Sequence, residues 1–60
     1  MKKPTEAQFV EYVEIRDSGV TNMFDIRRIT QMSKTGLTRE NCLYIMKYFV
    51  ELAEEYEVQI

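Results

Sequence analysis

The sequence predicts an all-α protein: a compact three-helix domain with a short C-terminal tail. Apolar residues recur at helical spacing along most of the chain, and the only two glycines, Gly19 and Gly36, separate the periodic segments. Of the 60 residues, 45% are hydrophobic and 30% are charged, which is typical of a globular chain and not of a disordered one. We therefore expect a single helical domain over 1–60, with helices at about 5–18, 22–35 and 38–56.

The first helix is predicted to begin after Thr5, because Gln8 lies three residues later and completes a capping box. Gly19 follows the last apolar position and is expected to end the helix in the left-handed conformation. Arg16 lies inside the apolar arc of this helix. Either its stem extends along the apolar surface to solvent or its guanidinium meets a carboxylate.

The second helix is predicted to begin with Asn22 as N-cap and with Asp25 at the third helical position, where a carboxylate favours the helix dipole. Ile26 and Ile29 form a narrow apolar stripe that would face the core. Gly36 is expected to end this helix in the way that Gly19 ends the first one.

The third helix is predicted to follow Thr38 as N-cap and to run without interruption to about Tyr56. Its apolar residues spread over half of the helix surface, which is typical of a central helix. They are Cys42, Leu43, Ile45, Met46, Phe49, Val50, Leu52, Ala53 and Tyr56. The short second helix cannot cover both this area and the broad apolar arc of the first helix, and we therefore expect a homodimer. Beyond Tyr56 the tail alternates with period two and is expected to be extended.

Composition excludes several kinds of site. The chain has no histidine and only one cysteine, Cys42, so histidine acid–base pairs, Cys/His zinc sites and intrachain disulfides are absent. The dipole of the third helix could lower the pKa of the Cys42 thiol, but Cys42 also lies on the apolar arc, and a core role is favoured. A chain this short leaves little room for a catalytic pocket. We expect a protein that is not an enzyme and that holds no metal and no cofactor.

The charge pattern and the apolar runs bear on location. No run of apolar residues is long enough to span a membrane, and glutamates follow Met1–Pro4 where a signal peptide would need an apolar stretch. We therefore expect a cytoplasmic protein.

The segment 15–26 reads I-R-D-S-G-V-T-N-M-F-D-I. It resembles the hallmark I-R-D-[ST]-G-x-T-N-M-F-D-[VI] of a family of short uncharacterised proteins of bacteriophages and prophages of Gram-positive bacteria. The resemblance is specific over this segment and looser elsewhere. It implies a small helical protein of mobile-element origin in a bacterial host cell, and it implies no activity. The same residues also describe a glycine helix stop followed by an asparagine cap.

One side of the third helix carries two tyrosines and two glutamates at i, i+4, i+7 and i+11: Tyr44, Tyr48, Glu51 and Glu55. Tyrosine is enriched at protein interfaces, and carboxylates near a helix C-terminus oppose the dipole, so local stability does not explain them. We interpret this side as a docking face for a host protein, such as a defence component, which the protein inhibits or modulates stoichiometrically. A solvated face with tyrosines at the rim of the core is the simpler interpretation.

A second hypothesis is a helix-turn-helix-like DNA-binding regulator of a mobile element. The run Thr35–Arg39 resembles the turn and the recognition-helix start of such domains. Candidate residues for base edges and phosphates are Thr38, Arg39 and Asn41, with Arg27, Arg28 and Lys34. Gln31 and Met32 depart from that motif, and a net charge of −2 disfavours contact with phosphates.

Overall fold

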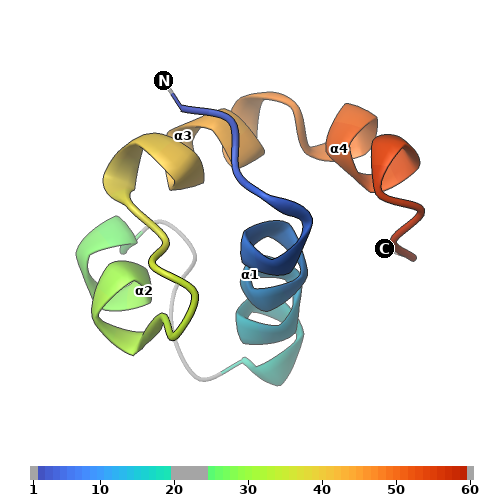
Figure 1. The fold of residues 1–60 in the computed structure, drawn as a ribbon. Coiled ribbons are helices and arrows are strands. Elements are labelled where there is room, and N and C mark those ends of the chain that lie inside the picture. Colours follow the sequence, from blue (N-terminus) through green and yellow to red (C-terminus); the bar gives the residue numbers. More distant parts are fainter. Residues whose placement is uncertain (1, 20–24, 60) are drawn as a thin grey trace.

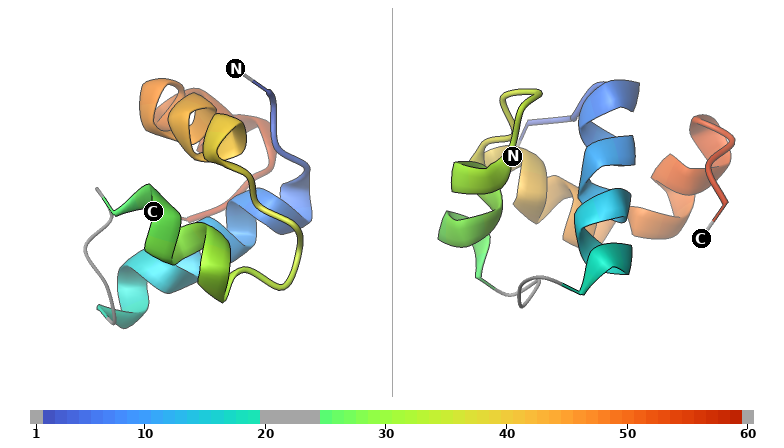
Figure 2. Two further views of the ribbon diagram at one scale, coloured as in Figure 1. Left: turned by 90° about the vertical axis from the view of Figure 1, so that its left-hand side faces the viewer. Right: turned by 90° about the horizontal axis from the view of Figure 1, so that it is seen from below.

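The computed structural model describes residues 2–19 and 25–59, which form four helices and no strand. In chain order these are α1 (Glu6–Ser18), α2 (Ile26–Met32), α3 (Arg39–Lys47) and α4 (Phe49–Glu55). Figure 1 shows α1 in the middle of the molecule, with α2 on one side of it, α4 on the other and α3 across the top. The view from below in Figure 2 gives the same order of α2, α1 and α4. The all-α class is confirmed, and the number of three helices is wrong.

Both predicted ends of α1 are confirmed. Thr5 Oγ1 accepts a hydrogen bond of 3.2 Å from the Gln8 backbone N–H, and Gln8 Oε1 accepts one of 2.9 Å from the Thr5 N–H. This is a complete capping box. At the other end, Gly19 has φ 66° and donates its N–H to the Arg16 carbonyl. A residue with a Cβ pays about 1–2 kcal/mol for this left-handed conformation, which explains the glycine.

The start of α2 differs from the prediction. The helix begins at Ile26, and Asp25 is its N-cap, with a carboxylate that accepts a hydrogen bond of 3.1 Å from the Arg28 N–H. Asp25 therefore caps the helix directly and does not occupy its third position. The predicted cap Asn22 lies outside the described residues.

The end of α2 also differs, because the helix stops at Met32 and Ser33 is already extended, with φ −69° and ψ 137°. Gly36 has φ 80° but lies further along the connection, so it does not end the helix. Ser33 provides the reason: its Oγ accepts the backbone N–H groups of Thr35 at 3.3 Å and Leu37 at 2.9 Å. A serine that captures nearby backbone donors competes with helix continuation.

The predicted third helix is broken at Tyr48, which separates α3 from α4. Tyr48 leaves the helical region, with φ −119° and ψ 32°. Its N–H still donates to the Tyr44 carbonyl and its carbonyl still accepts from the Leu52 N–H, each over 2.9 Å. No glycine or proline lies at the break, so local propensity does not cause it.

Packing accounts for the break, because it brings the side chains of Phe49 and Tyr56 against α1. The ring centroid of Phe49 lies 5.5 Å from that of Phe9 and 6.4 Å from that of Tyr12. The ring centroid of Tyr56 lies 6.1 Å from that of Phe9. Aromatic pairs at these separations each contribute about 0.5–1.5 kcal/mol beyond area burial. Val50, a member of the predicted apolar arc, is 60% exposed. The buried apolar residues are Phe9, Tyr12, Val13, Ile15, Ile29, Leu37, Cys42, Ile45, Leu52 and Ala53.

The first residues of the chain tie α3 and α4 together. Figure 1 shows this segment running past α3 to the start of α1. Asn41 Nδ2 donates to the Lys2 carbonyl over 2.9 Å, and the Tyr56 hydroxyl donates to the Pro4 carbonyl over 2.8 Å. Pro4 is buried beneath these contacts. The N-terminal segment is therefore part of the packed structure.

Candidate functional site

The two tyrosines of the predicted docking face lie against each other at the end of α3. The ring centroids of Tyr44 and Tyr48 are 4.7 Å apart, and the Lys47 ammonium lies 5.5 Å from the Tyr48 ring centroid. Both tyrosines are half-buried and pack against the core. They form the rim between the core and the outer surface of α4.

The two glutamates of that face lie on α4, beyond the break. Glu55 forms an ion pair of 2.6 Å with Lys3, and this hydrogen bond raises the pKa of the Lys3 ammonium. Glu51 is exposed. Because the helix changes direction at Tyr48, the four predicted residues do not form one straight stripe. The structure leaves Glu51 exposed and gives Glu55 a role within the chain.

Val50 marks a groove that the sequence did not indicate. The groove has a volume of about 390 Å³ and lies between α4 and the residues that follow it. It is lined by the apolar residues Val50, Ala53 and Val58, by Gln59, and by Glu54 and Glu57, whose exposed carboxylates we call its acidic rim. We call this the α4 groove. Val50 is the one large hydrophobic residue that is exposed in the described part of the chain.

A backbone motif at the end of α4 shapes this groove. The Val58 N–H donates to the Ala53 carbonyl over 2.9 Å and the Glu57 N–H to the Glu54 carbonyl over 3.3 Å. These two bonds define a Schellman motif. Glu57 holds its left-handed position, with φ 55°, where glycine is the usual residue. The predicted extended tail is therefore wrong at residues 56 and 57, where the chain turns and brings Val58 beside Ala53.

The charge of this surface is uncompensated within the described residues. Their ion pairs join Lys3 to Glu55 and Arg16 to Asp17. Glu51, Glu54 and Glu57 are all exposed and take part in neither pair. An apolar groove with an acidic rim is the result.

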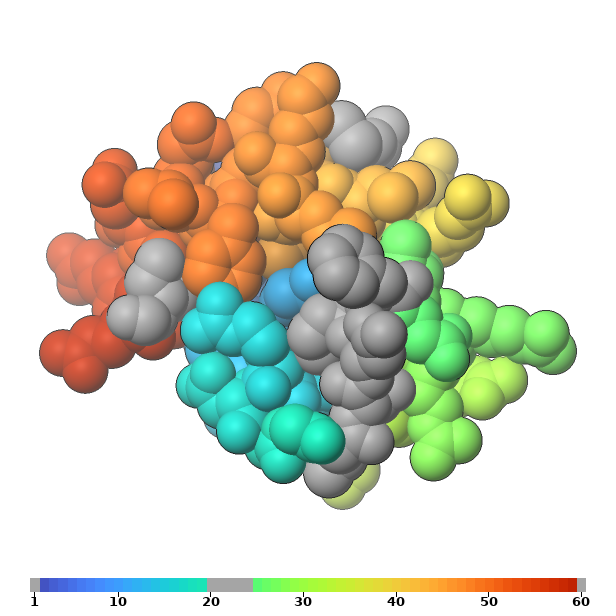
Figure 3. Space-filling view, turned by 180° about the vertical axis from the view of Figure 1, so that it is seen from behind, coloured from blue at the N-terminus to red at the C-terminus, as the bar shows by residue number. Residues whose placement is uncertain are grey.

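The basic candidate residues lie on the other side of α1. Arg27, Arg28, Lys34 and Arg39 are exposed on α2, on the following connection and at the start of α3. Figure 3 shows α2 (green) and α4 (red to orange) on opposite sides of the molecule, seen from behind. The protein therefore presents a basic side and an acidic side.

Two features of this basic side depart from a helix-turn-helix. Residues 33–38 connect α2 to α3, which is longer than the usual turn of about three to four residues. Asn41 is only 1% exposed. Its Oδ1 accepts from the Thr38 N–H and hydroxyl, and its Nδ2 donates to Lys2. The Asn41 amide is therefore used inside the fold as part of a capping box with Thr38.

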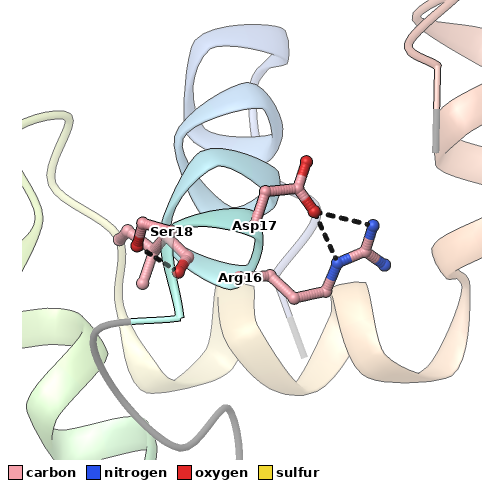
Figure 4. Close-up of polar contacts among 4 residues, drawn as sticks. Arg16, Asp17 and Ser18 are labelled. Atoms are coloured by element: carbon pink, nitrogen blue, oxygen red, sulfur yellow. Dashed lines mark hydrogen bonds and ion pairs between the residues drawn. The ribbon is translucent and has the colours of Figure 1, made fainter.

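Of the segment 15–26, the structure describes residues 15–19 and 25–26. In Figure 4, the Arg16 guanidinium meets the Asp17 carboxylate, with distances of 3.4 and 3.3 Å from Nε and the terminal nitrogen to Oδ1. The guanidinium also lies 4.7 Å from the Phe49 ring centroid. The Ser18 hydroxyl donates to the Ile15 carbonyl over 2.7 Å. Arg16 thus does both things considered for it: it covers apolar surface and meets a carboxylate.

Glu11 fixes the connection between α2 and α3, which the sequence did not indicate. Its carboxylate accepts hydrogen bonds from the Lys34 N–H at 2.8 Å, from Thr35 Oγ1 at 2.7 Å and from the Ser33 hydroxyl. Partial burial raises the pKa of the Glu11 carboxyl, but the bonds from Ser33, Lys34 and Thr35 outweigh it, and the pKa lies below its ordinary value.

Cys42 is fully buried, and burial raises the pKa of its thiol. Its predicted core position is confirmed. A second shallow groove, of about 610 Å³, lies along α1 and has Glu6 and Glu14 among its lining residues. We call this the α1 groove. In the described residues, no group of three or more possible metal ligands comes together.

Comparison with protein-family models, curated proteins and solved structures gives no match to this chain. None of the helices described here combines the length and the apolar character that crossing a membrane requires. The resemblance of residues 15–26 to the phage and prophage family stays a prediction.

Proposed function

We propose that this protein is a stoichiometric protein-binding module whose docking surface lies on α4. The exposed Val50 is the observation that carries the proposal, because carboxylates with no ion pair in the described part of the chain surround it. An exposed apolar residue with a charged rim is the usual anatomy of an interface. Tyr48 and Glu51 extend this surface toward the break between α3 and α4.

The biological role follows from the resemblance of residues 15–26 to small phage and prophage proteins. By analogy with that origin and with the small size of the chain, we propose that it inhibits or modulates one host protein, with a defence component as the natural target. The exposed carboxylates on α4 favour a partner whose contacting surface is positively charged.

Affinity purification from a Gram-positive host tests this proposal. Tagged wild-type protein, the double variant Val50→Asp with Glu51→Arg, and the control Glu6→Arg with Glu14→Arg are compared by quantitative mass spectrometry. The control changes carboxylates on the rim of the α1 groove. Wild type and control should retain one host protein at equal molar amount, and the Val50 and Glu51 variant should lose it. Equal retention by all three proteins would contradict the α4 surface.

DNA binding is the second candidate, and one observation favours it: Arg27, Arg28, Lys34 and Arg39 are exposed on one side of the molecule. A duplex DNA titration at two salt concentrations tests this hypothesis. DNA binding predicts an affinity that falls steeply with salt and that drops when Arg27 and Arg28 are both replaced by alanine. No shift at low salt would exclude it.

A further inference from the structure

We propose that the α4 groove binds a basic amphipathic helix, in which an apolar side chain enters between Val50 and Val58 and flanking lysine or arginine residues meet Glu54 and Glu57. This inference rests on the proposed function and names the class of partner that the surface fits. The groove supplies both parts of the match: an apolar floor at Ala53 and an acidic rim.

The shape of the surface favours a helix over an extended peptide. A docked strand needs a free sheet edge to satisfy its backbone groups, and the described residues contain no strand. The backbone of α4 is bonded within the helix and its Schellman end, as the bonds from Val58 to Ala53 and from Glu57 to Glu54 show. Within the described residues, the groove therefore offers side chains of α4 and of the residues that follow it, and no strand edge. A helix satisfies its own backbone hydrogen bonds, so docking there leaves none of them unpaired.

The carboxylates around the groove favour a partner helix that is positively charged. Glu54 and Glu57 are exposed on one rim, and Glu51 continues the acidic surface on α4. A second copy docked through the same groove by a twofold axis would bring these carboxylates against their equivalents, which like-charge repulsion disfavours. A partner helix with lysine or arginine on either side of its apolar stripe meets no such repulsion.

The helix end alone does not explain a glutamate at position 57. Glu57 keeps a left-handed backbone that glycine adopts without strain, and no Schellman bond requires its carboxylate. Glycine would therefore suit this helix end better than glutamate, and the helix end gives no reason for the carboxylate. Strained residues of this kind are concentrated at binding sites.

Three labelled synthetic peptides test the inference by fluorescence anisotropy with the full-length protein. The first has a leucine stripe flanked by lysines on a helical sequence; the second has glutamates in place of the lysines; the third has the first composition with prolines that prevent a helix. The lysine helix should bind at least about tenfold more tightly than either of the others. Equal binding of the proline peptide would overturn the helix, and equal binding of the glutamate peptide would overturn the charge match.

Variants of the protein locate the peptide. Val50→Ser and the double variant Glu54→Gln with Glu57→Gln should each weaken the lysine helix by at least about fivefold. The double variant Glu6→Gln with Glu14→Gln removes the same charge from the α1 groove and should change affinity by less than about twofold. Equal losses in the two double variants would show attraction to net charge only and would overturn the assignment of the groove. Circular dichroism of each variant confirms folding.

Failure of this inference and failure of the proposed function give different results. A host protein whose capture depends on Val50, together with no binding of the lysine helix, keeps the docking surface and overturns the partner class. Binding of the lysine helix at the groove, together with no captured host protein, supports the groove's specificity and overturns the cellular role. A third result is that the lysine helix does not bind and that the resonances of the groove residues shift as the protein concentration is raised. This result would assign the groove to a second copy of the chain.

Discussion

Thr35, in the connection between α2 and α3, donates its hydroxyl to the carboxylate of Glu11 on α1 over 2.7 Å. Ser33 and Lys34 donate to the same carboxylate, and Gln8 Nε2 on α1 donates to the carbonyls of Thr35 at 3.3 Å and Gly36 at 3.2 Å. Two side chains of α1, one helical turn apart, therefore hold a connection that has no regular structure of its own.

Replacing Glu11 by glutamine should lower the free energy of unfolding at neutral pH by about 1–2 kcal/mol, because charge-assisted hydrogen bonds become neutral ones. The folded pKa of Glu11 lies below its ordinary value. Its contribution is therefore complete above the ordinary pKa and is lost as the pH falls from there through the lower folded pKa. Urea unfolding of the wild type should show this loss in acid, and Glu11→Gln should reduce it. Glu14→Gln, an exposed neighbour on α1, is the control. Identical pH profiles of wild type and Glu11→Gln would contradict the role of Glu11.

Phe49 and Val50 test the break at Tyr48. Phe49 packs against Phe9 and Tyr12, whereas Val50 is largely exposed. Phe49→Ala should lower the free energy of unfolding by about 2 kcal/mol or more, and Val50→Ala should change it by less than about 0.5 kcal/mol. Urea unfolding measures both. Comparable losses at both positions would contradict the break, because they would require that both side chains are buried.

The sequence anticipated the helix ends that depend on nearby residues. Thr5 with Gln8, Gly19 and the cap Thr38 were predicted correctly, because each acts within a few residues of its own position. The break at Tyr48 was not predictable in this way, since it depends on contacts between Phe49 and a helix about forty residues earlier in the chain. The role of Glu11 was missed for the same reason: its partners lie more than twenty positions away.

The candidate site was only partly predictable. The sequence indicated that the glutamates near the end of the chain serve no local purpose, and Glu51 is indeed exposed. It also placed Glu55 on the docking face, where the structure pairs Glu55 with Lys3. The α4 groove itself depends on the left-handed Glu57, and a glutamate gives no sequence signal for that conformation.

Glu57→Gly should stabilise the protein by about 1 kcal/mol, because glycine adopts φ 55° without strain. For a domain of this size, that corresponds to a rise in Tm of roughly 4–8 °C. Glu57→Ala removes the same carboxylate and keeps the strain, so it should not raise Tm. Thermal unfolding followed by circular dichroism compares the three proteins. A higher Tm for the alanine variant than for the glycine variant would argue against the Schellman motif.

The prediction of a homodimer depends in part on an excess of apolar surface on the predicted third helix, which the structure divides into α3 and α4. The break at Tyr48 directs part of that surface, including Phe49, onto α1 within the same chain. The mass in solution tests the dimer directly: light scattering at micromolar concentration should give twice the chain mass of 7.2 kDa for a homodimer. A mass of 7.2 kDa would exclude it.

The most direct test of the α4 docking surface is chemical-shift mapping of the isotope-labelled protein with the captured host protein. The proposed function predicts saturation at one partner per chain, with the largest shifts at Val50, Glu51 and Glu54. Shifts centred on Arg27, Arg28 and Arg39 would contradict it and would place the working surface on the basic side of the molecule.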